Sequence, residues 1–69
     1  MPYFVKWYIA GQDEAQEQQT AYATSDHAMD FACAILRQDP TDIWVEDDAG
    51  NQVALAARIR RHCGARGLA

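Results

Sequence analysis

The sequence feature that most constrains the fold is a run of strand-forming residues at 3–9. Six of its seven residues are β-branched or aromatic, a composition typical of a pleated strand. Both faces of the run are apolar apart from Lys6, so the strand needs neighbours and cover from other elements. The run therefore predicts the central strand of a sheet.

The clearest helix lies at 25–38. Three residues around its start, 24–26, are suitable N-caps, and the dipeptide Asp39-Pro40 ends it because a residue before proline avoids helical angles. At about 100° per residue, the apolar side chains form one continuous stripe with Cys33 at its margin. The stripe consists of Ala28, Met29, Phe31, Ala32, Ile35 and Leu36.

A β-hairpin is expected after this helix. Residues 43–46 predict a third strand, and residues 47–51 predict a tight turn in which Gly50 or Asn51 takes a positive φ. Residues 52–54 then return as a short fourth strand, antiparallel to the third.

Two interpretations compete for the segment between the first strand and the helix. Residues 11–18 are polar and predict a loop, after which residues 19–24 predict a short second strand. The alternative is a helix over 12–23, since Glu, Gln and Ala favour helices. We prefer the strand because no apolar stripe runs through 12–19.

The C-terminal segment predicts a second helix at 54–63, with Gly64 as a suitable stop. Its apolar side chains share one face and are Leu55, Ala56, Ile59 and Cys63. With only 69 residues, the chain has room for one domain. We expect that domain over 1–63 and a flexible C-terminal tail over 64–69.

These elements predict an α+β fold with the order β-β-α-β-β and a short C-terminal helix. A hairpin makes the first two strands antiparallel, and a right-handed crossover through the helix places the third strand beside the first. One antiparallel sheet in the strand order 2-1-3-4 satisfies every pairing, with the helix at 25–38 on one face.

Alternation along the strands assigns the two faces of this sheet. Because Lys6 avoids the covered side, the face towards the helix carries Val5, Trp7, Ile9, Ile43 and Val45. The second face carries Phe4, Lys6, Tyr8, Trp44 and Glu46, with Tyr22 as a further member. We expect Lys6 and Glu46 to pair across the strands, which contributes about 0.2–1 kcal/mol.

The aromatic side chains of the second face allow three interpretations. In the first, residues 54–63 fold back and cover them with Leu55 and Ile59, since a small domain needs every apolar face it has. In the second, they bind a second copy of the chain or another protein. In the third, bases of a single-stranded nucleic acid stack on them.

The net charge of −4 combines an acidic body with a basic end. Residues 1–57 carry −8, and residues 58–69 carry +4 from Arg58, Arg60, Arg61 and Arg66. Such a segment predicts either a contact with nucleic acid or anionic lipid, or arginines that complement nearby acids or face solvent. We expect the second, and we do not expect nucleic acid as the main partner, because an acidic body opposes phosphate.

Residue types suited to metal binding or catalysis are present without the spacing those sites need. Cys33, Cys63, His27 and His62 are zinc ligands by type, but they do not form pairs separated by about two to four residues. No nucleophile is paired with a base, so we expect no enzyme, no cofactor and no metal. The residues 47–51 lack the pattern of a calcium loop.

Compartment is predicted from the cysteines and from hydropathy. Two cysteines do not make a disulfide framework, so we expect thiols in a cytoplasmic protein. No apolar run approaches the roughly 20 residues that span a bilayer, so we expect no membrane association.

The region Thr24–Ala54 combines a capped, alanine-rich helix with the run Ile43-Trp44-Val45 and the turn Asp47-x-x-Gly50. In this it resembles several families of small uncharacterised bacterial β-β-α-β-β proteins. The resemblance covers residues 3–54 and implies the fold, with no activity to carry over.

The sequence therefore predicts a non-enzymatic module that binds a second copy or another protein. Its expected surface combines the sheet aromatics Phe4, Tyr8, Tyr22 and Trp44 with the basic residues Arg58, Arg60 and Arg61. The alternative is weak single-stranded nucleic-acid binding through the Arg58–Arg61 segment and the same aromatics.

Overall fold

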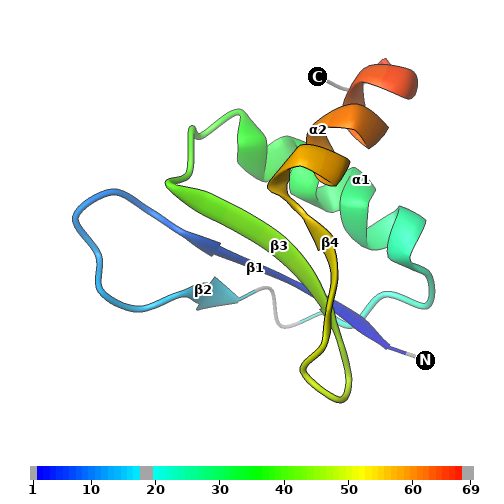
Figure 1. Ribbon diagram of the computed structural model, residues 1–69, viewed down its shortest axis with the longest axis horizontal. Coiled ribbons are helices and arrows are strands. Elements are labelled where there is room, and N and C mark those ends of the chain that lie inside the picture. Colours follow the sequence, from blue (N-terminus) through cyan, green and yellow to red (C-terminus); the bar gives the residue numbers. More distant parts are fainter. Residues whose placement is uncertain (1, 18–19, 68–69) are drawn as a thin grey trace.

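The computed structural model describes residues 2–17 and 20–67, and in them a four-stranded antiparallel sheet carries two helices (Figure 1). The strand order is β2-β1-β3-β4, so the predicted α+β fold and strand order are confirmed. The elements, in chain order, are β1 (Tyr3–Tyr8), β2 (Gln16–Glu17), α1 (Ser25–Leu36), β3 (Asp42–Asp47), β4 (Gln52–Leu55) and α2 (Ala56–Ala65).

The strand β1 is central, as its composition predicts. It pairs with β3 along its whole length, and Val5 lies opposite Val45. Both valines are fully buried on the helix side of the sheet. The apolar character of β1 therefore reflects its position between β2 and β3, where backbone groups on both edges have partners.

The second strand lies earlier in the chain than the sequence predicts. β2 consists of Gln16 and Glu17, inside the segment predicted as a loop, and a helix over 12–23 is therefore wrong. Residues 18–19 lie outside the described residues, and Tyr22 forms only an isolated bridge with Tyr3 through backbone hydrogen bonds of 2.8 and 2.9 Å. A two-residue edge strand is joined to the sheet by backbone hydrogen bonds and is exposed to water, so it needs no apolar side chains.

The helix α1 begins where its capping residues predict. Thr24 is the N-cap, and its Oγ1 accepts a hydrogen bond of 3.2 Å from the His27 amide. The helix ends at Leu36, two residues before the predicted end, and Asp39 then takes a φ of 54° as the chain turns into β3. The apolar stripe of α1 packs on the sheet, with both central alanines fully buried.

The helix α2 lies beside α1 on the same face of the sheet, directly after β4 (Figure 1). Its residues Ile59 and Cys63, one helical turn apart, are fully buried against that side. The prediction that residues 54–63 cover the aromatic second face is therefore wrong. The small Ala54, buried opposite Val45 on the helix side, leaves room there for Ile59.

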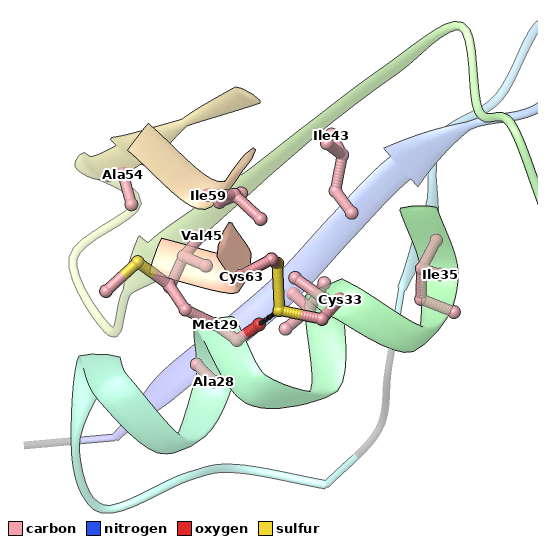
Figure 2. Close-up of a cluster of buried hydrophobic side chains, with 11 residues drawn as sticks. Ala28, Met29, Cys33, Ile35, Ile43, Val45, Ala54, Ile59 and Cys63 are labelled. Carbon is pink, nitrogen blue, oxygen red and sulfur yellow. Dashed lines mark hydrogen bonds between the residues drawn. A yellow bond between two sulfur atoms is a disulfide. The ribbon is translucent and has the colours of Figure 1, made fainter. Parts of the chain in front are cut away.

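The two helices are covalently joined by a disulfide between Cys33 and Cys63, so the prediction of two thiols is wrong (Figure 2). Both cysteines lie in the buried cluster between the helices and the sheet. The Cys33 sulfur also lies 3.1 Å from the Met29 carbonyl oxygen. A disulfide sulfur carries no proton, so this approach is a contact and not a hydrogen bond.

Candidate functional site

The face of the sheet opposite the helices is uncovered by any element that the structure describes. Strand register places eight side chains on it, which together we call the open sheet face: Phe4, Lys6, Tyr8, Glu17, Asp42, Trp44, Glu46 and Leu55. Five of them are on the face that alternation predicts. Leu55 joins them because it lies opposite Trp44 at the end of β4.

Neighbouring side chains on the open sheet face shield its largest ring. Trp44 is only 8% exposed, and the Tyr8 ring packs against it with a centroid distance of 5.6 Å. The indole Nε1–H of Trp44 donates a hydrogen bond of 2.8 Å to Glu46 Oε1. By contrast, Leu55 is 55% exposed, and it is the only large hydrophobic side chain of the described residues that is so exposed.

The single lysine of the open sheet face pairs with two of its carboxylates. Lys6 Nζ lies 2.9 Å from Glu46 Oε2 and 3.7 Å from Glu17 Oε1, so the predicted cross-strand pair is confirmed. Hydrogen bonding to Glu46 raises the pKa of Lys6. Reciprocally, the hydrogen bond from Lys6, and then that from Trp44, lower the pKa of Glu46 against the opposing effect of burial.

Tyr22 does not belong to the open sheet face, and its predicted place there is wrong. Its ring stacks on Phe31 of α1 with a centroid distance of 5.9 Å, and it packs against the buried cluster. Tyr22 pairs with Tyr3, whose side chain also packs against that cluster. Sequence reasoning placed Tyr22 in a regular strand. In the structure a single bridge to Tyr3 sets the orientation of Tyr22, and its ring lies on the helix side of the sheet.

The arginines Arg58, Arg60 and Arg61 lie on α2, on the opposite side of the sheet from the open sheet face. None of the three forms an ion pair within residues 2–17 and 20–67. The structure therefore does not bring the predicted aromatic and basic site residues together on one surface.

The carboxylate of Asp30 on α1 contacts two basic side chains at the C-terminal end of α2. Its Oδ1 lies 2.7 Å from His62 Nε2, and its Oδ2 lies 3.3 Å from the Arg66 guanidinium. The hydrogen bond with His62, followed by the charge of Arg66, lowers the pKa of Asp30. We expected the arginines to complement nearby acids or to face solvent, and Arg58, Arg60 and Arg61 are exposed. The Asp47 carboxylate of the hairpin accepts hydrogen bonds from Ala49 and Asn51.

The residue types that bind metals are dispersed or occupied. The two cysteines form the disulfide, and His62 contacts Asp30. In the part of the chain that the structure describes, no three side chains of His, Cys, Asp or Glu gather as metal ligands. None of the described helices is both long and apolar enough to cross a bilayer.

Comparison with protein-family models, with curated proteins and with solved structures finds no match to this chain. The resemblance to small bacterial β-β-α-β-β proteins stays a prediction. The functional argument therefore depends on the surfaces of the molecule itself.

Two features of the structure were missed by sequence reasoning. Leu55 was assigned to the buried face of the second helix, although it is the last residue of β4 and faces outward. The disulfide was missed because the two cysteines are 30 residues apart. The spacing of Ile59 and Cys63, one turn apart, was the signal that Cys63 points into the core.

Proposed function

We propose that the protein is a non-enzymatic module that self-associates weakly through the open sheet face. The observation that carries this proposal is the 55% exposure of Leu55 beside Trp44 on a face that neither helix covers. A partly exposed apolar surface of this kind is typical of a contact with another protein.

The charge distribution restricts contact with a second copy to the apolar side chains of the open sheet face. In a two-fold contact the same patch meets itself, so a patch with unpaired charge of one sign repels its copy. On the open sheet face Lys6 offsets only part of the negative charge of Glu46 and Glu17, and Asp42 is a further exposed carboxylate opposite Tyr8. The apolar side chains Phe4, Tyr8 and Leu55 therefore supply the contact.

The dimensions of the sheet limit the strength of this contact. Four strands spaced by about 4.8 Å and about six residues long at about 3.3 Å each give a face of at most about 400 Å². Two such faces bury about 800 Å² in total, below the roughly 1,200 Å² of stable interfaces. We therefore expect a weak, concentration-dependent dimer.

Sedimentation equilibrium of the full chain, from micromolar to millimolar concentration, tests this proposal. The mean mass of the wild-type protein is expected to rise above the monomer mass of 7.7 kDa towards twice that value. Leu55→Asp places a charge in the contact and is expected to keep the protein monomeric. The matched control Ala57→Asp adds the same charge to an exposed position of α2 and is expected to behave as the wild type.

Two outcomes would overturn the proposal. One is a wild-type protein that stays monomeric at millimolar concentration. The other is a Leu55→Asp variant that associates as strongly as the wild type, because association would then use a different surface.

The alternative of single-stranded nucleic-acid binding has less support. It requires Trp44 and the arginines of α2 to contact one strand, whereas they lie on opposite sides of the sheet. A titration with single-stranded RNA at low salt tests it, and coupled shifts at Trp44 and at Arg58 and Arg61 would revive it.

The cytoplasmic location stays a prediction. The buried Cys33–Cys63 disulfide argues against it, because such bonds persist mainly in oxidising compartments. Thiol labelling of cells lysed directly into denaturant tests the point, since both cysteines are labelled if the protein is kept reduced and neither is labelled if the disulfide is present.

A further inference from the structure

A groove runs between α1 and α2 on the helix side of the molecule, away from the open sheet face. It has a volume of about 460 Å³. Six residues line it: Asp26, Met29, Arg58, Arg61, His62 and Ala65. The volume is within the range of about 300–1,000 Å³ that small-molecule sites occupy.

Helical spacing explains why α2 presents basic groups to this groove. Arg61, His62 and Ala65 follow Arg58 by three, four and seven residues, so all four share one side of α2. Met29 of α1, which is only 2% exposed, lies at the base of the groove. The groove therefore presents the guanidinium groups of Arg58 and Arg61 on one side of α2.

The cations of the groove are not neutralised by the protein. Arg58 and Arg61 form no ion pair within the described residues, although the chain as a whole carries −4. The one carboxylate that lines the groove, on Asp26, lies more than 4.0 Å from both guanidinium groups. The neighbouring Asp30 is already engaged by His62 and Arg66.

The two walls of the groove are fixed relative to each other. The Cys33–Cys63 disulfide joins α1 to α2, and Cys63 directly follows the groove residue His62. The contact between His62 and Asp30 adds a second link between the helices. A ligand that binds between fixed walls loses less free energy to ordering of the protein.

We propose that the α1–α2 groove binds a small oxyanion, a phosphate or carboxylate group, through Arg58 and Arg61. The planar guanidinium forks match two oxygens of either group. This site is on the opposite side of the sheet from the self-association surface and is independent of it.

NMR titration of the full-length, disulfide-bonded protein tests this proposal. Inorganic phosphate and citrate are added in separate series at constant ionic strength, with chloride as the reference anion. Saturable shifts are expected at the Nε–Hε signals of Arg58 and Arg61 and at the amide of Ala65. A response to one probe alone identifies whether phosphate or carboxylate is preferred, and no saturable shift with either probe would overturn the proposal.

A matched pair of variants separates a site from diffuse attraction. Arg61→Gln is expected to weaken binding by about three- to fivefold, which is the upper part of the effect of losing one exposed ion pair. Arg60→Gln removes the same charge from the adjacent position, which does not line the groove, and is expected to change affinity by less than about twofold. Asp26→Asn removes the opposing carboxylate and is expected to tighten binding.

Equal weakening by Arg60→Gln and Arg61→Gln would overturn the proposal, because binding would then follow net charge alone. Well-dispersed amide spectra show whether the three variants are folded. All three positions are exposed in the structure, so none of the substitutions removes a buried group.

Discussion

Replacing both Cys33 and Cys63 with alanine is expected to remove a large part of the stability of this protein. The disulfide joins residues separated by 30 positions, from the third turn of α1 to the last turns of α2. In the unfolded chain it closes this loop and thereby lowers the conformational entropy that folding must overcome. The folded state keeps Ile59 and the other contacts of α2 in place.

The magnitude follows from the loop length. A closed loop of 30 residues corresponds to about 3.6 kcal/mol at 25 °C in the chain-entropy treatment. A domain of this length has a total free energy of unfolding of about 3–10 kcal/mol. The double variant therefore retains a free energy of unfolding between about 0 and 6 kcal/mol, and it is expected to be partly unfolded if the intact protein is at the lower end.

Urea denaturation followed by tryptophan fluorescence measures the effect. With a slope of about 1 kcal/mol per molar urea, the loss moves the midpoint down by about 3–4 M. Wild-type protein treated with a reductant is expected to move by a similar amount, and this serves as the control for the alanine side chains. A midpoint that shifts by less than about 0.5 M in both samples would refute the reasoning, since the two helices would then not be held by this bond.

Three further predictions concern single positions. Ile59→Ala, at a fully buried site, is expected to cost about 2–5 kcal/mol and is measured by the same denaturation assay; a cost below 1 kcal/mol would mean that α2 does not pack in the core. Gly50→Ala is expected to cost about 1 kcal/mol in thermal unfolding, because Gly50 has a φ of 85° and no atoms near an added Cβ, so only backbone strain is introduced. Glu46→Gln is expected to cost up to about 1 kcal/mol at neutral pH. The folded-state pKa of Glu46 is lowered from 4.5 and that of Lys6 is raised from 10.5. The difference in stability from the wild type is therefore complete between pH 4.5 and pH 10.5, and it disappears as the pH falls through the lowered pKa of Glu46 or rises through the raised pKa of Lys6. A difference that does not depend on pH would contradict the ion pair.

Much of the fold was predictable because local patterns and pairing rules point the same way. The apolar run in β1 requires a central strand, and the capping residues around Thr24 define the start of α1. The alternation around Lys6 correctly separated the two faces of β1 and β3. Each of these inferences depends on neighbours in sequence or on a regular period, and both can be read without coordinates.

The position of α2 was not predictable from the same patterns. Leu55 and Ile59 are both apolar and close in sequence, so either face of the sheet offered them a place. They separate because the chain changes from strand to helix between Leu55 and Ala56, which leaves Leu55 on the open side and turns Ile59 to the other. The position of α2 depends on Ala54, which is buried opposite Val45, and on Cys33, which is bonded to Cys63 of α2. A local sequence pattern does not identify either contact.

The polar edge strand is a second case in which tertiary context decides. Gln16 and Glu17 have low strand propensity, yet they pair with Trp7 and Lys6 of β1. The pairing is supported by an ion pair between Lys6 and Glu17, a contact across strands that sequence reasoning had not considered. Sequence patterns favoured the more apolar residues around Tyr22 instead.

The open sheet face of one copy is expected to contact that of another. Isotope-filtered NOE measurement on a millimolar mixture of labelled and unlabelled protein tests it most directly. Intermolecular NOEs are expected from the Leu55 methyl groups to the rings of Phe4 or Tyr8 in the other copy. Intermolecular NOEs confined to the methyl groups and side chains of α1 and α2, or their complete absence at a concentration where sedimentation shows a dimer, would contradict it.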